Sequence, residues 1–150
     1  MSIAVDIAEA VVATLNAHNF GTAFTAERHY IPQYELAEMQ TLRVTVVAKE
    51  MTTSTASRGA ASREVTIDVA VQQKLDAPGS PTTEQAATDA LMDLSEAIAD
   101  YLRVTPLLNQ PGAKWLRTEH TAIYAPEHLD QMRQFTSVAT LTYRVMHPGS

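Results

Sequence analysis

The spacing of apolar residues along the chain predicts two amphipathic helices. Residues 2–18 place apolar side chains at helical spacing behind Ser2, which is a suitable N-cap. Residues 82–103 repeat this pattern behind Thr82 and Gln85, which match a capping box. The acidic residues of the second helix fall away from its apolar stripe: Asp89, Asp93, Glu96 and Asp100.

Alternation of apolar and polar residues predicts strands around these helices. The clearest case begins at Arg63, where Val65, Ile67 and Val69 alternate with polar neighbours. The expected strands cover 22–31, 42–50, 63–75, 114–124 and 135–146.

Two of these strands frame a long polar segment. Residues 42–50 and 63–75 are expected to pair as an antiparallel hairpin, with 51–62 as its tip. Pro126 to Met132 is interpreted as a short helical turn that begins at a proline. This order of elements predicts an α+β fold: a mostly antiparallel sheet with two main helices packed on one face and a long β-hairpin arm. We expect a single domain over 1–150, with the other sheet face and the edges free for neighbours.

Composition and charge exclude several classes of protein. The 150 residues are 45% hydrophobic and 19% charged, an ordinary globular balance. The net charge of −6 argues against nucleic acid as a main partner, because phosphate binding favours a basic face. The absence of cysteine excludes disulfides, zinc–thiolate sites and a cysteine nucleophile. Apolar runs are too short for a bilayer and the N-terminus lacks signal-peptide features, so we expect assembly in a cytoplasm and no membrane partner.

The titratable residues follow no catalytic or metal-binding pattern. Five histidines are present, but none has the spacing of an H-E-x-x-H site. Glu127, His128 and Asp130 share the predicted turn, where a solvated polar surface is favoured over a metal site. There is no G-x-S-x-G elbow and no glycine-rich phosphate loop. We therefore expect a protein that is not an enzyme, with no catalytic, cofactor-binding or metal-binding residues and no cofactor.

The hairpin is locally basic within this acidic chain. Lys49, Arg58 and Arg63 lie at or near its tip, and Arg43 lies on its first strand. These four residues are the candidates for contacts with a partner. Two interpretations remain open: an ordinary polar loop tip, or an arm that becomes ordered on the acidic surface of a partner.

The order of elements and two short stretches resemble phage tail terminator (tail completion) proteins. The stretches are Arg28-His-Tyr-Ile-Pro-Gln-Tyr34 and the ending Gln134-Phe-Thr-Ser-Val-Ala-Thr-Leu-Thr-Tyr-Arg144. The resemblance covers nearly the whole chain and has no single diagnostic motif. It implies a structural virion protein at the head-proximal end of the tail. Such a protein forms a hexameric ring that caps the tail tube, stops its growth and joins the head connector.

Two further readings compete with a tail terminator. One is another head–tail connector or a minor tail protein, which follows the same assembly logic. The other is a small α+β enzyme, against which the missing motifs argue, or a generic oligomeric binding module. A ring with affinity for tail tubes favours termination, whereas a pocket with a perturbed histidine or carboxylate favours an enzyme.

Overall fold

The computed structural model describes residues 2–29, 42–74, 81–122 and 134–148. Within these ranges the chain forms two helices and five strands. The helices are α1 (Ile3–Asn16) and α2 (Pro81–Val104). The strands are β1 (Ala26–Arg28), β2 (Arg43–Ser57), β3 (Ala60–Lys74), β4 (Lys114–Ala122) and β5 (Gln134–Pro148).

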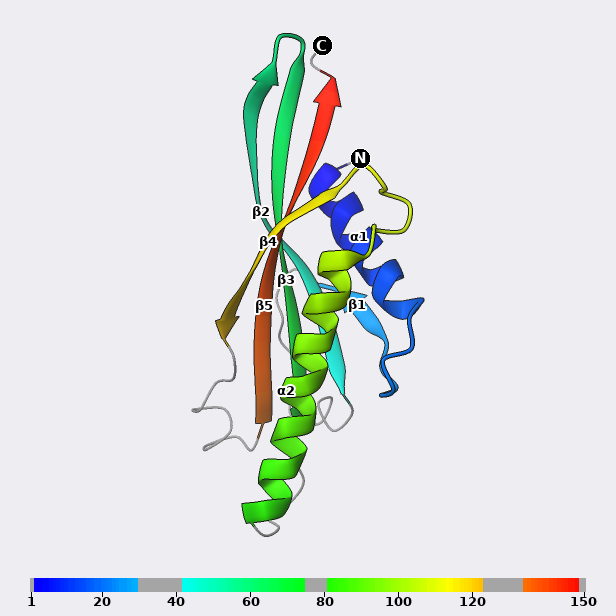
Figure 1. Cartoon of the computed structure of the whole chain (residues 1–150), viewed down its shortest axis with the longest axis vertical. Coiled ribbons are helices and arrows are strands. Elements are labelled where there is room, and N and C mark those ends of the chain that lie inside the picture. Colours follow the sequence, from blue (N-terminus) through cyan, green and yellow to red (C-terminus); the bar gives the residue numbers. More distant parts are fainter. Residues whose placement is uncertain (1, 30–41, 75–80, 123–133, 149–150) are drawn as a thin grey trace.

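The described strands form one sheet in the order β1-β2-β3-β5-β4. The pairs β2–β3, β3–β5 and β5–β4 are antiparallel, and β1 pairs with β2 in parallel. Both helices cover the same face of this sheet (Figure 1). The predicted α+β class, with a mostly antiparallel sheet and helices packed on it, is therefore confirmed.

The core lies between the helices and the apolar side of the sheet. Ser2 caps α1 as predicted, because its Oγ accepts a hydrogen bond from the Val5 N–H at 3.4 Å. The predicted apolar stripes of both helices are buried, apart from the partly buried Ile3 and Tyr101. The largest buried side chains come from both helices and the two central strands: Ile7, Leu15, Ile67, Ile98, Leu102, Phe135, Leu141 and Tyr143.

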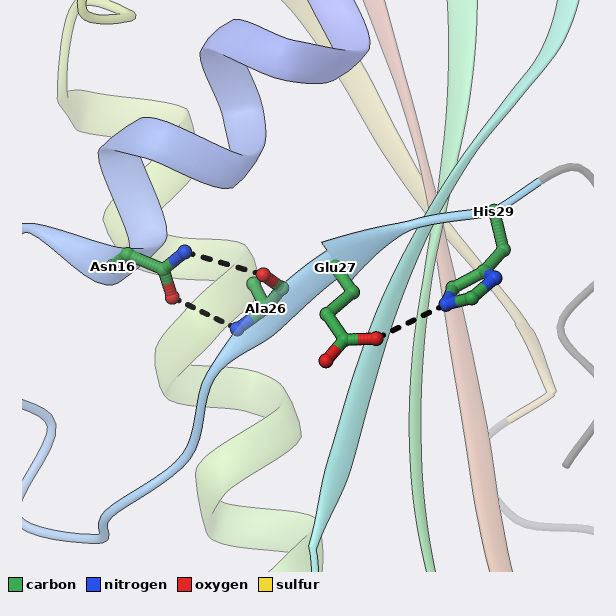
Figure 2. A network of polar contacts seen from close by, with 4 residues as sticks. All are labelled: Asn16, Ala26, Glu27 and His29. Carbon is green, nitrogen blue, oxygen red and sulfur yellow. Dashed lines mark hydrogen bonds and ion pairs between the residues drawn. The ribbon is translucent and has the colours of Figure 1, made fainter. Parts of the chain in front are cut away.

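The first strand is shorter than its sequence predicts. Where residues 22–31 were expected to be extended, the described strand covers only Ala26–Arg28. The chain turns before it, because Gly21 has φ +84° and its N–H donates to Asn19 Oδ1 at 2.8 Å. Asn16 then holds Ala26 through two hydrogen bonds, so pairing with β2 begins there (Figure 2).

The expected soft tip at 51–62 is wrong. β2 and β3 continue through this segment and pair up to Ser57 and Ala60, leaving Arg58 and Gly59 as the turn. Gly59 has φ +85°, a conformation that glycine adopts without the steric cost of a Cβ. The threonines here are β-branched and suit a strand, and β5 adds a third strand as far as Pro148. These three strands form an arm that projects beyond both helices (Figure 1).

The polar face of the sheet is less open than predicted. Thr45, Gln72, Thr136 and Thr142 lie on the face opposite the helices and are all buried. Short side chains on central strands are shielded by neighbours on both flanking strands, which contributes to this burial. This lower part of the face is therefore not free for a partner.

Several smaller expectations fall outside the described residues. These are the turn at 126–132, the end of the strand expected over 114–124, and the stretch from Tyr30 to Tyr34. α2 begins at Pro81, and the side chains of its predicted capping pair are likewise not described.

Candidate interaction surface

The arm consists of the upper halves of β2, β3 and β5. Thr53 pairs with Arg63, which pairs in turn with Val145, and this row lies beyond the buried core positions of β2 and β3. On β2, the residues from Met51 to Thr55 are all exposed. The arm is thus a three-stranded polar ribbon with an exposed outer strand.

Arg58 lies at the tip of this ribbon. It precedes Gly59 in the turn and is exposed. The structure therefore supports the tip position that the sequence suggested for this candidate.

Lys49 lies at a bulge lower on β2. The register skips it between the pairs Ala48–Ile67 and Glu50–Thr66. Its Nζ is 4.0 Å from Asp68 Oδ2, and the other carboxylate oxygen of Asp68 accepts a 2.6 Å hydrogen bond from Thr140 Oγ1. Lys49 is 45% exposed. It therefore already has an acidic partner in its own chain.

Arg63 lies on the helix-side face of the arm and is partly buried. Its Nε is buried and has no hydrogen-bond partner within the described part of the chain. A buried donor without an acceptor is costly, but this atom is covered and no partner reaches it unless the side chain moves. Among the four predicted contacts, it has the clearest structural sign of an unmet interaction.

Arg43 lies far from the other candidates. It begins β2, opposite Gln72, whereas Arg58 follows the end of the same strand. A 15-residue strand spans roughly 50 Å, so these arginines lie at opposite ends of the sheet. The four predicted residues therefore do not form one cluster.

A second basic group, which the sequence analysis missed, lies where β4 meets β5. Lys114 is paired with Arg144 across the strands, and both are exposed. Arg117 lies nearby on β4, with its Nη1 3.9 Å from Glu64 Oε1. Only the register of β4 on β5 brings these side chains together, so no local sequence signal marks them.

A hollow of about 160 Å³ lies between the C-terminal end of α2 and the start of β4. Arg103, Pro106, Lys114, Trp115 and Tyr143 are among its lining residues. Burial raises the pKa of the Tyr143 phenol, and this hydroxyl has no hydrogen-bond partner among the described residues. No described carboxylate or histidine lines the hollow.

Among the described residues, no three side chains of histidine, aspartate or glutamate lie close enough to hold a metal ion. The predicted cluster of Glu127, His128 and Asp130 lies outside those residues. The acidic residues of α2 are exposed, on the side away from its apolar stripe. Neither α1 nor α2 has the length and apolar character needed to cross a bilayer.

Comparison with known proteins finds similarity at the level of solved structures. No family model matches the chain, and no curated protein matches it. Among solved structures, it is similar to a chain from the virion of a native gene transfer agent particle. The TM-score is 0.54 at 18% identity, and the match covers 97% of this chain and 100% of the other. At this identity the match shows a shared fold across the full length of both chains.

Proposed function

We propose that this protein is the tail terminator of a phage-like particle. In this role it forms a hexameric ring on the head-proximal end of the tail tube, stops tube growth and offers a surface to the head–tail connector. One observation carries the proposal: the fold is shared, from end to end, with a chain of a gene transfer agent virion. The specific role of tail terminator comes from the sequence resemblance to that family.

The arm supports an assembly role. A three-stranded ribbon that projects beyond the helices gives a subunit reach toward a neighbour or a tube (Figure 1). Arg58 supplies a positive charge at its tip, and Arg63 supplies a buried donor that lacks an acceptor among the described residues. An exposed positive charge such as Arg58 speeds association with an acidic partner surface and helps to orient it.

The test follows the protein through assembly. Light scattering coupled to size exclusion should find a hexamer, either directly or as concentration rises. Added to polymerising tail tube protein from the same particle, it should shorten the tubes and appear as a ring at one end. Arg58→Ser should weaken capping, whereas Arg103→Ser, which removes an exposed arginine on α2, should not.

Two outcomes would contradict termination. If the ring binds an isolated head connector but leaves tube lengths unchanged, the protein is a connector component instead. If the protein neither forms a ring nor binds tubes or connectors, the proposal of a virion assembly role fails.

A further inference from the structure

The outer edge of β2 is unusually open. Beyond its short pairing with β1 at Val44 to Val46, β2 contacts no strand on its outer side among the described residues. Natural sheets protect such edges with proline, charge or short length. Between its register shifts at Ala48–Glu50 and Thr55–Ser57 this edge is regular, with no proline and no charge from Met51 to Thr55, and Met51 is 45% exposed. By contrast, the arm's edge on β5 ends at Pro148.

One hydrogen bond shows which residues of β2 direct their backbone N–H and C=O groups away from β3. The Val46 carbonyl accepts from the His29 N–H at 3.0 Å, so Val46 points its backbone groups away from β3. Outward and inward residues alternate along an antiparallel strand, and the bulge at Lys49 shifts this alternation by one. Met51, Thr53 and Thr55 therefore present the outward N–H and C=O groups.

The same alternation carries across the sheet to β4. Because Thr140 and Thr142 direct their backbone groups toward β4, their partners Glu119 and Arg117 are the inward residues there. Thr118 and His120 then direct their N–H and C=O groups away from the sheet. β4 thus presents the other open edge of the described sheet, regular from Arg117 to His120 between its two register shifts.

We propose that the outer edge of β2 pairs with the outer edge of β4 in a second copy of this chain, so that the sheet continues from subunit to subunit. This inference rests on the proposed ring. β2 and β4 run in opposite directions, because three antiparallel steps separate them. In a ring whose copies all have the same orientation, β2 of one copy and β4 of the next would therefore lie side by side as antiparallel strands.

The side chains agree with this arrangement. Thr53 lies on the helix-side face of β2, and Thr118 lies on the helix-side face of β4 opposite the buried Leu141. Residues paired across antiparallel strands share a face, so the helices of adjoining copies stay on one side of the joined sheet. Pairing of β2 with β2 would reverse every second copy, and the ring would lose the two different faces that a cap requires.

Backbone substitutions test the edge itself. Thr53→Pro or Thr55→Pro removes an outward N–H without removing a bond to β3, and edge positions of this kind tolerate proline. Both should abolish the ring at concentrations where the natural protein is fully assembled. Thr53→Val keeps the N–H and the shape of the side chain, so it should assemble normally. Unchanged melting temperatures will show that the monomer is intact.

Cross-linking tests the partner strand. The chain has no cysteine, so introduced thiols are unique. The double variant Thr53→Cys with Thr118→Cys, treated with a short bismaleimide, should give a ladder of covalent multimers ending at the ring. Each single variant should remain monomeric on a denaturing gel. Dimers from Thr53→Cys alone would show β2 pairing with β2 and overturn the inference.

The outcome separates this inference from the proposed function. If rings form and cap tubes while the proline variants assemble normally, the edge pairing is wrong but termination stands. If the natural protein forms no ring even beside tail tubes, both are overturned. A ladder from the double variant together with loss of assembly in the proline variants would establish the pairing.

Discussion

Asn16 holds Ala26 by both of its backbone groups. At the end of α1, the Asn16 Nδ2 donates to the Ala26 carbonyl at 3.2 Å, and the Ala26 N–H donates to Asn16 Oδ1 at 2.8 Å (Figure 2). Ala26 is buried, begins β1 and pairs in parallel with Val44 of β2. The side-chain amide of Asn16 therefore joins the first helix to the edge of the sheet, because it pairs with the N–H and C=O of Ala26 as the backbone of a neighbouring strand would.

This clamp predicts a loss of stability on truncation. Asn16→Ala removes both partners of Ala26 and should lower the free energy of unfolding by about 1–3 kcal/mol, because buried backbone groups lose their hydrogen bonds. Asn16→Asp keeps the acceptor and loses the donor, so its loss should be smaller. Chemical denaturation measures both, and equal stability of all three proteins would show that the clamp contributes nothing.

The two contacts of Asp68 predict that replacing Asp68 destabilises the protein more than replacing Lys49 does. Lys49 is 45% exposed and 4.0 Å from the carboxylate, so Lys49→Ala should cost at most about 1 kcal/mol. Asp68→Ala removes the 2.6 Å hydrogen bond from Thr140 to a charged acceptor and should cost about 1.5–3 kcal/mol. Urea denaturation of the two variants measures this difference. Because Asp68→Ala removes the Lys49 contact as well, an equal loss would mean that the Thr140 hydrogen bond adds no stability.

The helices and the fold class were predictable from local pattern. Ser2 predicts the N-cap of α1, and the helical spacing of Ile7 and Val11 predicts its buried face. In the structure Ser2 is the N-cap, and Ile7 and Val11 are buried. Such signals are local, since each residue's environment follows from neighbours within two turns. The strand from Arg63 onward was found for the same reason.

The arm was mispredicted because its order depends on a distant strand. Thr53 and Thr55 read as a polar tip, although their β-branched side chains suit a strand. The third strand that supports this hairpin comes from around Val145, more than half the chain away. Among the candidate site residues, Arg58 was placed correctly at the tip. The grouping of Lys114 with Arg144 required a register that the sequence does not reveal.

Tyr143 predicts a loss of stability in alkaline solution. Its phenol is buried, and burial raises its pKa above the usual value near 10 that it has in the unfolded chain. Below pH 10 both states hold the proton, so there is no effect. Above pH 10 the unfolded chain releases the proton first, and the free energy of unfolding falls as pH rises.

Tyr143→Phe is the matched control for this pH dependence. The hydroxyl has no hydrogen-bond partner among the described residues, so its removal should cost little near neutral pH. The variant should lose less stability than the natural protein between pH 10 and 11.5, measured by thermal unfolding. Identical alkaline profiles would show that the phenol ionises freely in the folded state.

Shortening the arm by matched pairs separates folding from assembly. Deleting Thr53, Ser54, Ser62 and Arg63 removes two cross-strand pairs and preserves the alternation of side chains between the two faces. The deleted rows lie beyond the buried apolar residues of β2 and β3, which end at Val65. The melting temperature should therefore fall by only about 2–4 °C, the change expected for a loss near 1 kcal/mol in a domain of this size.

Assembly should respond very differently to the same deletion. The shortened arm carries less of the open β2 edge, lacks the unpartnered Arg63 donor and reaches less far, so ring formation and tube capping should be lost. Light scattering and tube lengths measured by electron microscopy test this, with Arg103→Ser as a control that leaves the arm intact. If the shortened protein forms rings and caps tubes as the natural one does, the arm has no part in assembly, and its contacts must be sought at the basic group around Arg144 instead.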